Sequence, residues 1–152
     1  MKIYLAGPLF TQAEQDWLRR LKAQMLTRSA VAPVEVYWPH DLFSSQEIAD
    51  WGDRAKHEIF ERCREYLDKS DAVVALLDGT QVDDGTAWEI GYFFARRRPG
   101  KPIIGLRTDF RKAGDTANAM VNLMIDCACD TIVTTVDDLL LEIGKLPKYM
   151  AM

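Results

Sequence analysis

The chain has 152 residues, of which 48% are hydrophobic and 28% charged, and its formal net charge is −4. This length and composition predict one globular domain, residues 1–152, that is large enough to bury a core. The negative charge gives no reason to expect binding to nucleic acid or to a membrane, and no run approaches roughly 18 consecutive apolar residues.

Two features indicate a cytoplasmic protein. The chain enters an apolar run at once, without a basic leader, so we expect no secretory signal. Its three cysteines, Cys63, Cys127 and Cys129, are odd in number and lack the paired CxxC spacing of a zinc site. We therefore expect reduced thiols and no metal site.

Strand-like and helical patterns alternate along the chain. Gly7 and Pro8 stop the first strand, and Thr11 with Glu14 forms a capping box for the first helix. Short apolar runs predict strands at 2–6, 34–38, 72–77, 103–106 and 131–134. Helical spacing predicts helices after residue 11, over 48–68, after residue 83, over 118–127 and over 136–143, with a short tail from 145 to 152.

This alternation predicts an α/β fold with a doubly wound five-stranded parallel sheet. Right-handed crossovers and one reversal of strand order give the flavodoxin-like order 2-1-3-4-5. The reversal falls between the first and third strands, so the loops that follow them, 7–11 and 78–89, are expected to share one site. The charged loop 107–111 is expected to be either a lid or a solvated turn.

The segment from residue 71 to residue 95 is the most informative. Asp83, Asp84 and Gly85 mark the start of a helix with an Asp as its cap. Glu89 then lies about one turn into the helix, where the helix dipole favours an ionised carboxylate. Taken alone, Glu89 could equally be a solvated surface residue.

The motifs of several other enzyme classes are missing. The chain has no GxGxxG after its first strand, no GxxxxGK[ST] and no GxSxG, so we expect no cofactor. Three carboxyl groups near one loop, Asp78, Asp83 and Glu89, are compatible with glycosyl chemistry, in which one carboxylate attacks and an acid protonates the leaving group. Acidic loops are also common on surfaces, and spacing alone leaves both interpretations open.

Four segments in order resemble the nucleoside 2-deoxyribosyltransferase family. They are residues 2–10, residues 83–92, Gly100-Lys101-Pro102 with Arg107-Thr108-Asp109, and Asn122-Leu123-Met124. The resemblance implies an enzyme that moves a 2-deoxyribosyl group between nucleobases by a retaining double displacement. It also implies deoxynucleosides and free nucleobases as small-molecule partners, and a homo-oligomer with sites shared between subunits.

The resemblance assigns roles to individual residues. Glu89 would attack C1′ and form a covalent intermediate, and Asp83 would hold and protonate the base. Tyr4, or the loop with Gly7, Pro8 and Phe10, would position the nucleophile and sugar. Asn122 would reach the 5′-hydroxyl from a neighbouring subunit. We expect the remaining contacts with substrate to come from Cys63, Asp78, Gly85 and Met124.

One position departs from the family. Many members carry an Asp 26 residues before the nucleophile, where this chain has Cys63. A thiol is a poor general acid at neutral pH, so protonation of the base would depend on Asp83. Two rival functions stay open: a 2′-deoxynucleoside 5′-monophosphate N-glycosidase, which passes the same intermediate to water, and a non-catalytic nucleoside-binding module.

Overall fold

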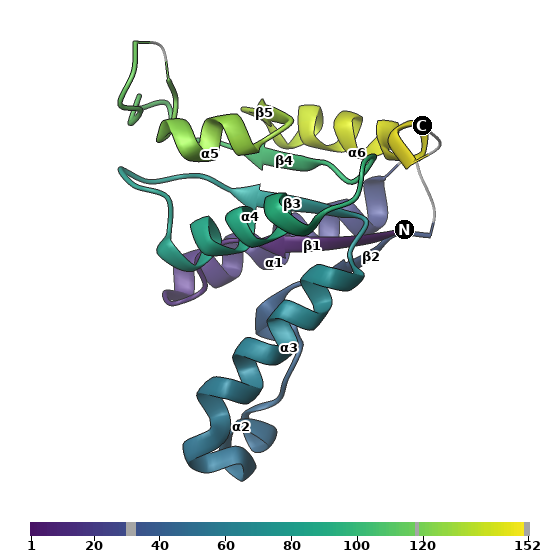
Figure 1. Cartoon of the computed structure of the whole chain (residues 1–152), viewed down its shortest axis with the longest axis vertical. Coiled ribbons are helices and arrows are strands. Elements are labelled where there is room, and N and C mark those ends of the chain that lie inside the picture. The colour runs from purple at the N-terminus through teal and green to yellow at the C-terminus, as the bar shows by residue number, and fades with distance from the viewer. Residues whose placement is uncertain (30–32, 118, 151–152) are drawn as a thin grey trace.

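The chain forms a five-stranded sheet with helices on both faces, in a computed structural model that describes residues 1–29, 33–117 and 119–150 (Figure 1). The strands are β1 (Lys2–Ala6), β2 (Glu35–Tyr37), β3 (Ala72–Leu76), β4 (Ile103–Leu106) and β5 (Thr131–Val133). The helices are α1 (Gln12–Arg28), α2 (Ser45–Trp51), α3 (Ala55–Lys69), α4 (Asp84–Arg96), α5 (Leu123–Ala128) and α6 (Val136–Met150), with 3-10 turns at Pro39–Asp41 and Gly52–Arg54.

The sheet has the expected topology. Its strand order is β2-β1-β3-β4-β5, and every pairing is parallel. Ala6 of β1 lies opposite Ala75 of β3, and Leu76 of β3 lies opposite Leu106 of β4. The carboxyl ends of β1, β3 and β4 therefore meet at one edge, with the reversal of strand order between β1 and β3.

The two faces of the sheet carry separate cores. Buried residues of α1 and α6 pack on one face, and buried residues of α3, α4 and α5 pack on the other. Because side chains alternate along a strand, Ile3 and Leu5 of β1 face α1 and α6, whereas Tyr4 and Ala6 face α3 and α4. This alternation places the phenol of Tyr4 on the face covered by α4, the helix that carries Glu89.

The loop after β1 runs close to its neighbours because it begins with a glycine. A Cβ atom on Gly7 would lie 3.0 Å from Leu18 Cδ1 and 3.3 Å from Leu76 Cβ. Thr11 then caps α1, and the expected capping box is present: Glu14 N donates to Thr11 Oγ1, and Thr11 N donates to the Glu14 carboxylate. The loop is thus fixed at both ends.

Three predicted helix boundaries are wrong. The helix expected over 48–68 is interrupted at Gly52, whose φ of +51° ends α2, and a 3-10 turn leads into α3. Figure 1 shows α2 and the start of α3 extending away from the sheet. The last helix continues past residue 143 to Met150, because Leu146 is buried against the sheet. The helix expected from residue 118 begins at Leu123, and residue 118 lies outside the described residues.

Candidate active site

Tyr4 and Glu89 meet on the α4 face of the sheet. The Tyr4 hydroxyl donates a hydrogen bond of 2.5 Å to Glu89 Oε1. Tyr4 is fully buried in the middle of β1, and Glu89 is partly buried in the second turn of α4. Hydrogen bonds to a charged acceptor are short, so this length suits a phenol that donates to a carboxylate. The bond fixes the orientation of the Glu89 side chain.

The electrostatics of Glu89 differ from the sequence-based expectation. Its pKa is raised to about 7, chiefly by burial; the Tyr4 hydrogen bond lowers the pKa and the negative charge of Asp83 raises it. The helix dipole was expected to favour the ionised form, but loss of solvent around the carboxylate outweighs it. A carboxylate with such a pKa ionises near neutral pH and is then poorly solvated.

Cys63 of α3 joins this pair. Its thiol interacts with the Tyr4 hydroxyl, and both burial and the nearby Glu89 raise the pKa of Cys63 to about 11. Burial, with the charges around it, also raises the pKa of Tyr4 well above its ordinary value. Both groups are therefore neutral at physiological pH, and the thiol adds no second negative charge beside Glu89.

Asp83 caps α4, as expected. Its Oδ2 atom accepts hydrogen bonds of 2.9 Å from both the backbone N–H and the hydroxyl of Thr86. These two bonds orient the carboxylate at the start of the helix that carries Glu89. Gly85, in the first turn, is exposed, and its N–H donates to Asp84.

Asp78 binds the neighbouring loop. Its Oδ1 accepts from the backbone N–H groups of Thr108 and Asp109, at 2.6 and 2.9 Å, and its Oδ2 accepts from the Thr108 hydroxyl at 2.5 Å. These bonds give the carboxylate a structural role. The contact of Asp78 with substrate stays a prediction.

The loop after β1 supplies an exposed aromatic side chain. Phe10 is 76% exposed, and its backbone N–H donates to Glu14. Gly7 is buried and Pro8 is half-buried between β1 and this exposed tip. The side chain of Phe10 is therefore available for contact with another molecule, while the preceding residues are held.

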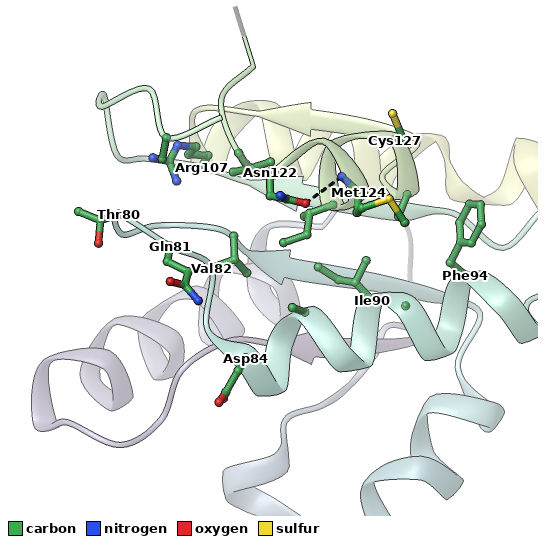
Figure 2. A pocket seen from close by; sticks show the side chains of 16 residues that line it. Thr80, Gln81, Val82, Asp84, Ile90, Phe94, Arg107, Asn122, Met124 and Cys127 are labelled. Atoms are coloured by element: carbon green, nitrogen blue, oxygen red, sulfur yellow. Dashed lines mark hydrogen bonds between the residues drawn. The ribbon is translucent and has the colours of Figure 1, made fainter. Parts of the chain in front are cut away.

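Asn122 and Met124 lie elsewhere. They line a cavity of about 900 Å³ between α4 and α5, together with Ile90 and Phe94 of α4, and Glu89 is not part of that lining (Figure 2). Asn122 caps α5 by accepting from Met124 N at 3.0 Å, and the Met124 side chain is 73% exposed. The fold thus brings Tyr4, Cys63, Asp83 and Glu89 together, but places Asn122 and Met124 on a different side of α4.

In the charged loop after β4, the sequence pattern did not predict the burial of Arg107. Arg107 was expected in a lid or a solvated turn, yet it is only 1% exposed. Its guanidinium donates to the backbone carbonyls of Leu77, Gly79 and Arg111. The Arg-Thr-Asp motif was visible in the sequence, but its burial was not.

The described ranges contain neither a metal-ligand group nor a membrane-spanning helix. Within 1–29, 33–117 and 119–150, no three His, Cys, Asp or Glu side chains are grouped so that they could hold a metal ion. Over the same ranges, no helix has the length and apolar character needed to span a membrane.

The chain belongs to the nucleoside 2-deoxyribosyltransferase family, because the model of that family matches residues 3–124. An uncharacterized protein of Ureaplasma parvum serovar 3 is 32% identical over 158 residues, which cover 95% of this chain and 98% of that protein. The family match indicates an enzyme that modifies small-molecule nucleosides.

Two solved structures share the fold. A 2-desoxiribosyltransferase from Leishmania mexicana aligns with a TM-score of 0.67 at 20% identity, over 95% of this chain and 97% of that one. The CMP N-glycosidase BcmB of Clostridium botulinum aligns with a TM-score of 0.52 at 18% identity, over 94% and 98%. At these identities the likeness concerns the fold alone.

The raised pKa of Glu89 predicts how stability depends on pH. The folded protein holds the Glu89 proton up to about pH 7, whereas the unfolded chain releases it near its ordinary pKa of 4.5. The stabilisation from Glu89 is therefore complete below about pH 4.5 and is lost as the pH rises through 7. Relative to Glu89→Gln, which carries no titrating proton, the wild type should lose up to about 3 kcal/mol between pH 4.5 and pH 7.5. Urea denaturation across this range measures the difference, and a difference that does not change with pH would contradict the assignment.

Proposed function

We propose that this protein transfers the 2-deoxyribosyl group between nucleobases through a covalent deoxyribosyl-Glu89 intermediate. The observation that carries the proposal is the hydrogen bond from Tyr4 to Glu89, which orients a poorly solvated carboxylate six residues after the Asp83 cap. A nucleophile and an acid on one helix, beside a strand that orients the nucleophile, suit substitution at a sugar carbon. The family match supports the same chemistry.

The reaction has two balanced steps. In the first, an ionised Glu89 oxygen bonds to C1′, the bond from C1′ to the base nitrogen breaks, and the base takes the electron pair and a proton from Asp83, which enters this step as the protonated carboxyl. In the second, a nitrogen of the incoming base attacks C1′, the ester bond to Glu89 breaks, and the proton of that base returns to Asp83. Two inversions at C1′ give net retention.

The other residues of the site would bind and orient substrate. Tyr4 would hold Glu89 in its attacking orientation, and the neutral Cys63 would leave Asp83 as the acid for the base. Gly7, Pro8 and Phe10 would form the wall of the site at the carboxyl end of β1. Gly85 stays a candidate substrate contact, whereas we assign Asp78 a structural role, because both of its oxygens accept hydrogen bonds from the neighbouring loop.

Asn122 and Met124 would act from a second copy of the chain. They line the cavity between α4 and α5, away from the Tyr4 and Glu89 of their own chain. A homo-oligomer in which this face meets the site of a neighbour would let each Asn122 reach the 5′-hydroxyl of a nucleoside bound next to the partner's Glu89.

The first test is transfer itself. Incubation with 2′-deoxyinosine and adenine should yield 2′-deoxyadenosine and hypoxanthine, separated by liquid chromatography. Glu89→Ala should lower the rate at least about a thousandfold, because it removes the nucleophile. Glu65→Ala, which changes an exposed glutamate on α3, is the matched control and should leave the rate unchanged. Release of hypoxanthine and free deoxyribose at the same rate without adenine would instead indicate a hydrolase.

A second prediction concerns pH. Ionised Glu89 is the reactive form, so kcat/KM should fall as the pH drops below about 7. The hydroxyl of Tyr4 lowers the pKa of Glu89, so Tyr4→Phe should move this acid limb to higher pH as well as lower the maximal rate. Tyr66→Phe, on α3, is the control. A Tyr4→Phe profile that keeps the wild-type acid limb would contradict the role of the phenol.

A third prediction concerns shared sites. Glu89→Ala and Asn122→Ala chains should each have little activity, but co-expressed chains should form mixed dimers in which one site carries neither change. For a dimer, random assortment restores about a quarter of the wild-type activity. No recovery in oligomers purified through a different affinity tag on each variant, and therefore containing both chains, would contradict the sharing of Asn122.

A further inference from the structure

The loops that follow β3 and β4 are tied together by three charged side chains. Leu77, Asp78 and Gly79 follow β3, and residues 107–111 follow β4. The two strands are parallel neighbours, so both loops leave the same edge of the sheet. The backbone hydrogen bonds between β3 and β4 continue one residue beyond β3, because Leu77 N donates to Leu106 O at 2.8 Å.

Each loop places a carboxylate on the backbone of the other. Asp78 accepts from the N–H groups of Thr108 and Asp109, as well as from the Thr108 hydroxyl. In return, Asp109 Oδ2 accepts from Gly79 N at 3.2 Å. The side chain and backbone of Arg111 also bind Asp109 and hold its pKa below the ordinary range, so this carboxylate stays ionised.

Arg107 links the two loops from the protein interior. Its buried guanidinium reaches the carbonyls of Leu77 and Gly79 in the first loop and that of Arg111 in its own loop. Gly79 therefore has both its N–H and its C=O bound by the second loop. Its φ of +110° is a conformation that side-chain-bearing residues rarely adopt, so the chain turns sharply at this fixed point.

The fixed point lies just before the catalytic helix. Only Thr80, Gln81 and Val82 separate Gly79 from Asp83, and Val82 is buried. Three intervening residues, the last of them buried, limit how far the helix cap can move relative to Gly79. We propose that Asp78, Arg107 and Asp109 form a clasp whose function is to position Asp83 for proton transfer to the base. They are positioning residues that act through Asp83, and this inference rests on the proposed function for its kinetic consequences.

The clasp predicts a selective loss of rate. In Asp78→Ala, kcat for 2′-deoxyinosine should fall roughly 10- to 100-fold with little change in KM, since displacement of a catalytic group by about 1 Å has effects of that size. The base of 7-methyl-2′-deoxyinosine is already cationic, so it leaves as a neutral molecule without accepting a proton from Asp83. The burst of free base released without an acceptor reports the first step alone, so for this nucleoside the burst rate should fall less than about threefold. Asp78→Asn keeps an oxygen for the two backbone N–H groups and should recover most of the lost rate.

A control separates positioning from general destabilisation. Asp130 also binds a backbone N–H of β4, that of Ile103 at 2.7 Å, and pairs with Arg97, but it does so at the amino end of the strand. Asp130→Ala should lower the melting temperature as Asp78→Ala does, yet leave kcat unchanged for both substrates. If Asp78 had only a structural role, both variants would have a lower melting temperature, and neither would change the ratio of the rates with the two nucleosides.

A second measurement does not depend on activity. Hydrogen exchange followed by mass spectrometry should show faster exchange over residues 79–83 in Asp78→Ala than in the wild type or in Asp130→Ala. Unchanged exchange in this segment, or equal rate losses with the two nucleosides, would overturn the clasp. If the wild type transfers deoxyribose from neither nucleoside, the proposed function is refuted instead. The hydrogen-exchange result would still decide whether the clasp holds the loop.

Discussion

The hydrogen bond from the Tyr4 hydroxyl to the Glu89 carboxylate is the interaction on which the site depends. It joins β1 to α4 beside the reversal of strand order, and it exists because alternation along β1 turns Tyr4 toward the α4 face. Burial makes ionisation of Glu89 costly, and the phenol offsets part of that cost. The outcome is a carboxylate that ionises near neutral pH with little solvation, which is the state that a nucleophile requires.

Three carboxylates near this edge of the sheet differ in what surrounds them. Asp78 is engaged by the backbone and hydroxyl of the neighbouring loop. Asp83 is held on one oxygen by Thr86 at the start of α4. Glu89 accepts a hydrogen bond from the Tyr4 phenol, and loss of solvent raises its pKa. These different environments agree with the different roles that we propose for the three side chains: a link between loops, an acid at a helix cap, and a nucleophile.

Much of the fold follows from local patterns, whereas the site depends on contacts that no local pattern contains. The alternation of strand and helix patterns, with right-handed crossovers and one reversal, predicted the order of the sheet. The interruption at Gly52 was missed because apolar spacing continues across it, and the extension of α6 was missed because burial of Leu146 depends on the sheet beneath it. The contact of Tyr4 with Cys63 forms because α3 packs on the face of the sheet to which the Tyr4 side chain points. Arg107 was expected in a lid or a solvated turn, because its partners are backbone carbonyls, which the amino-acid sequence does not identify.

The central claim is that Glu89 becomes covalently bound to the sugar. We would incubate the wild-type protein with 2′-deoxyinosine and no acceptor base, quench it rapidly in acid, and map its peptides by mass spectrometry. The account predicts one added 2-deoxyribosyl group on the peptide that contains Glu89, which disappears when adenine is added before the quench. An unmodified Glu89 peptide in protein that nevertheless exchanges bases, or the group on a different residue, would contradict it.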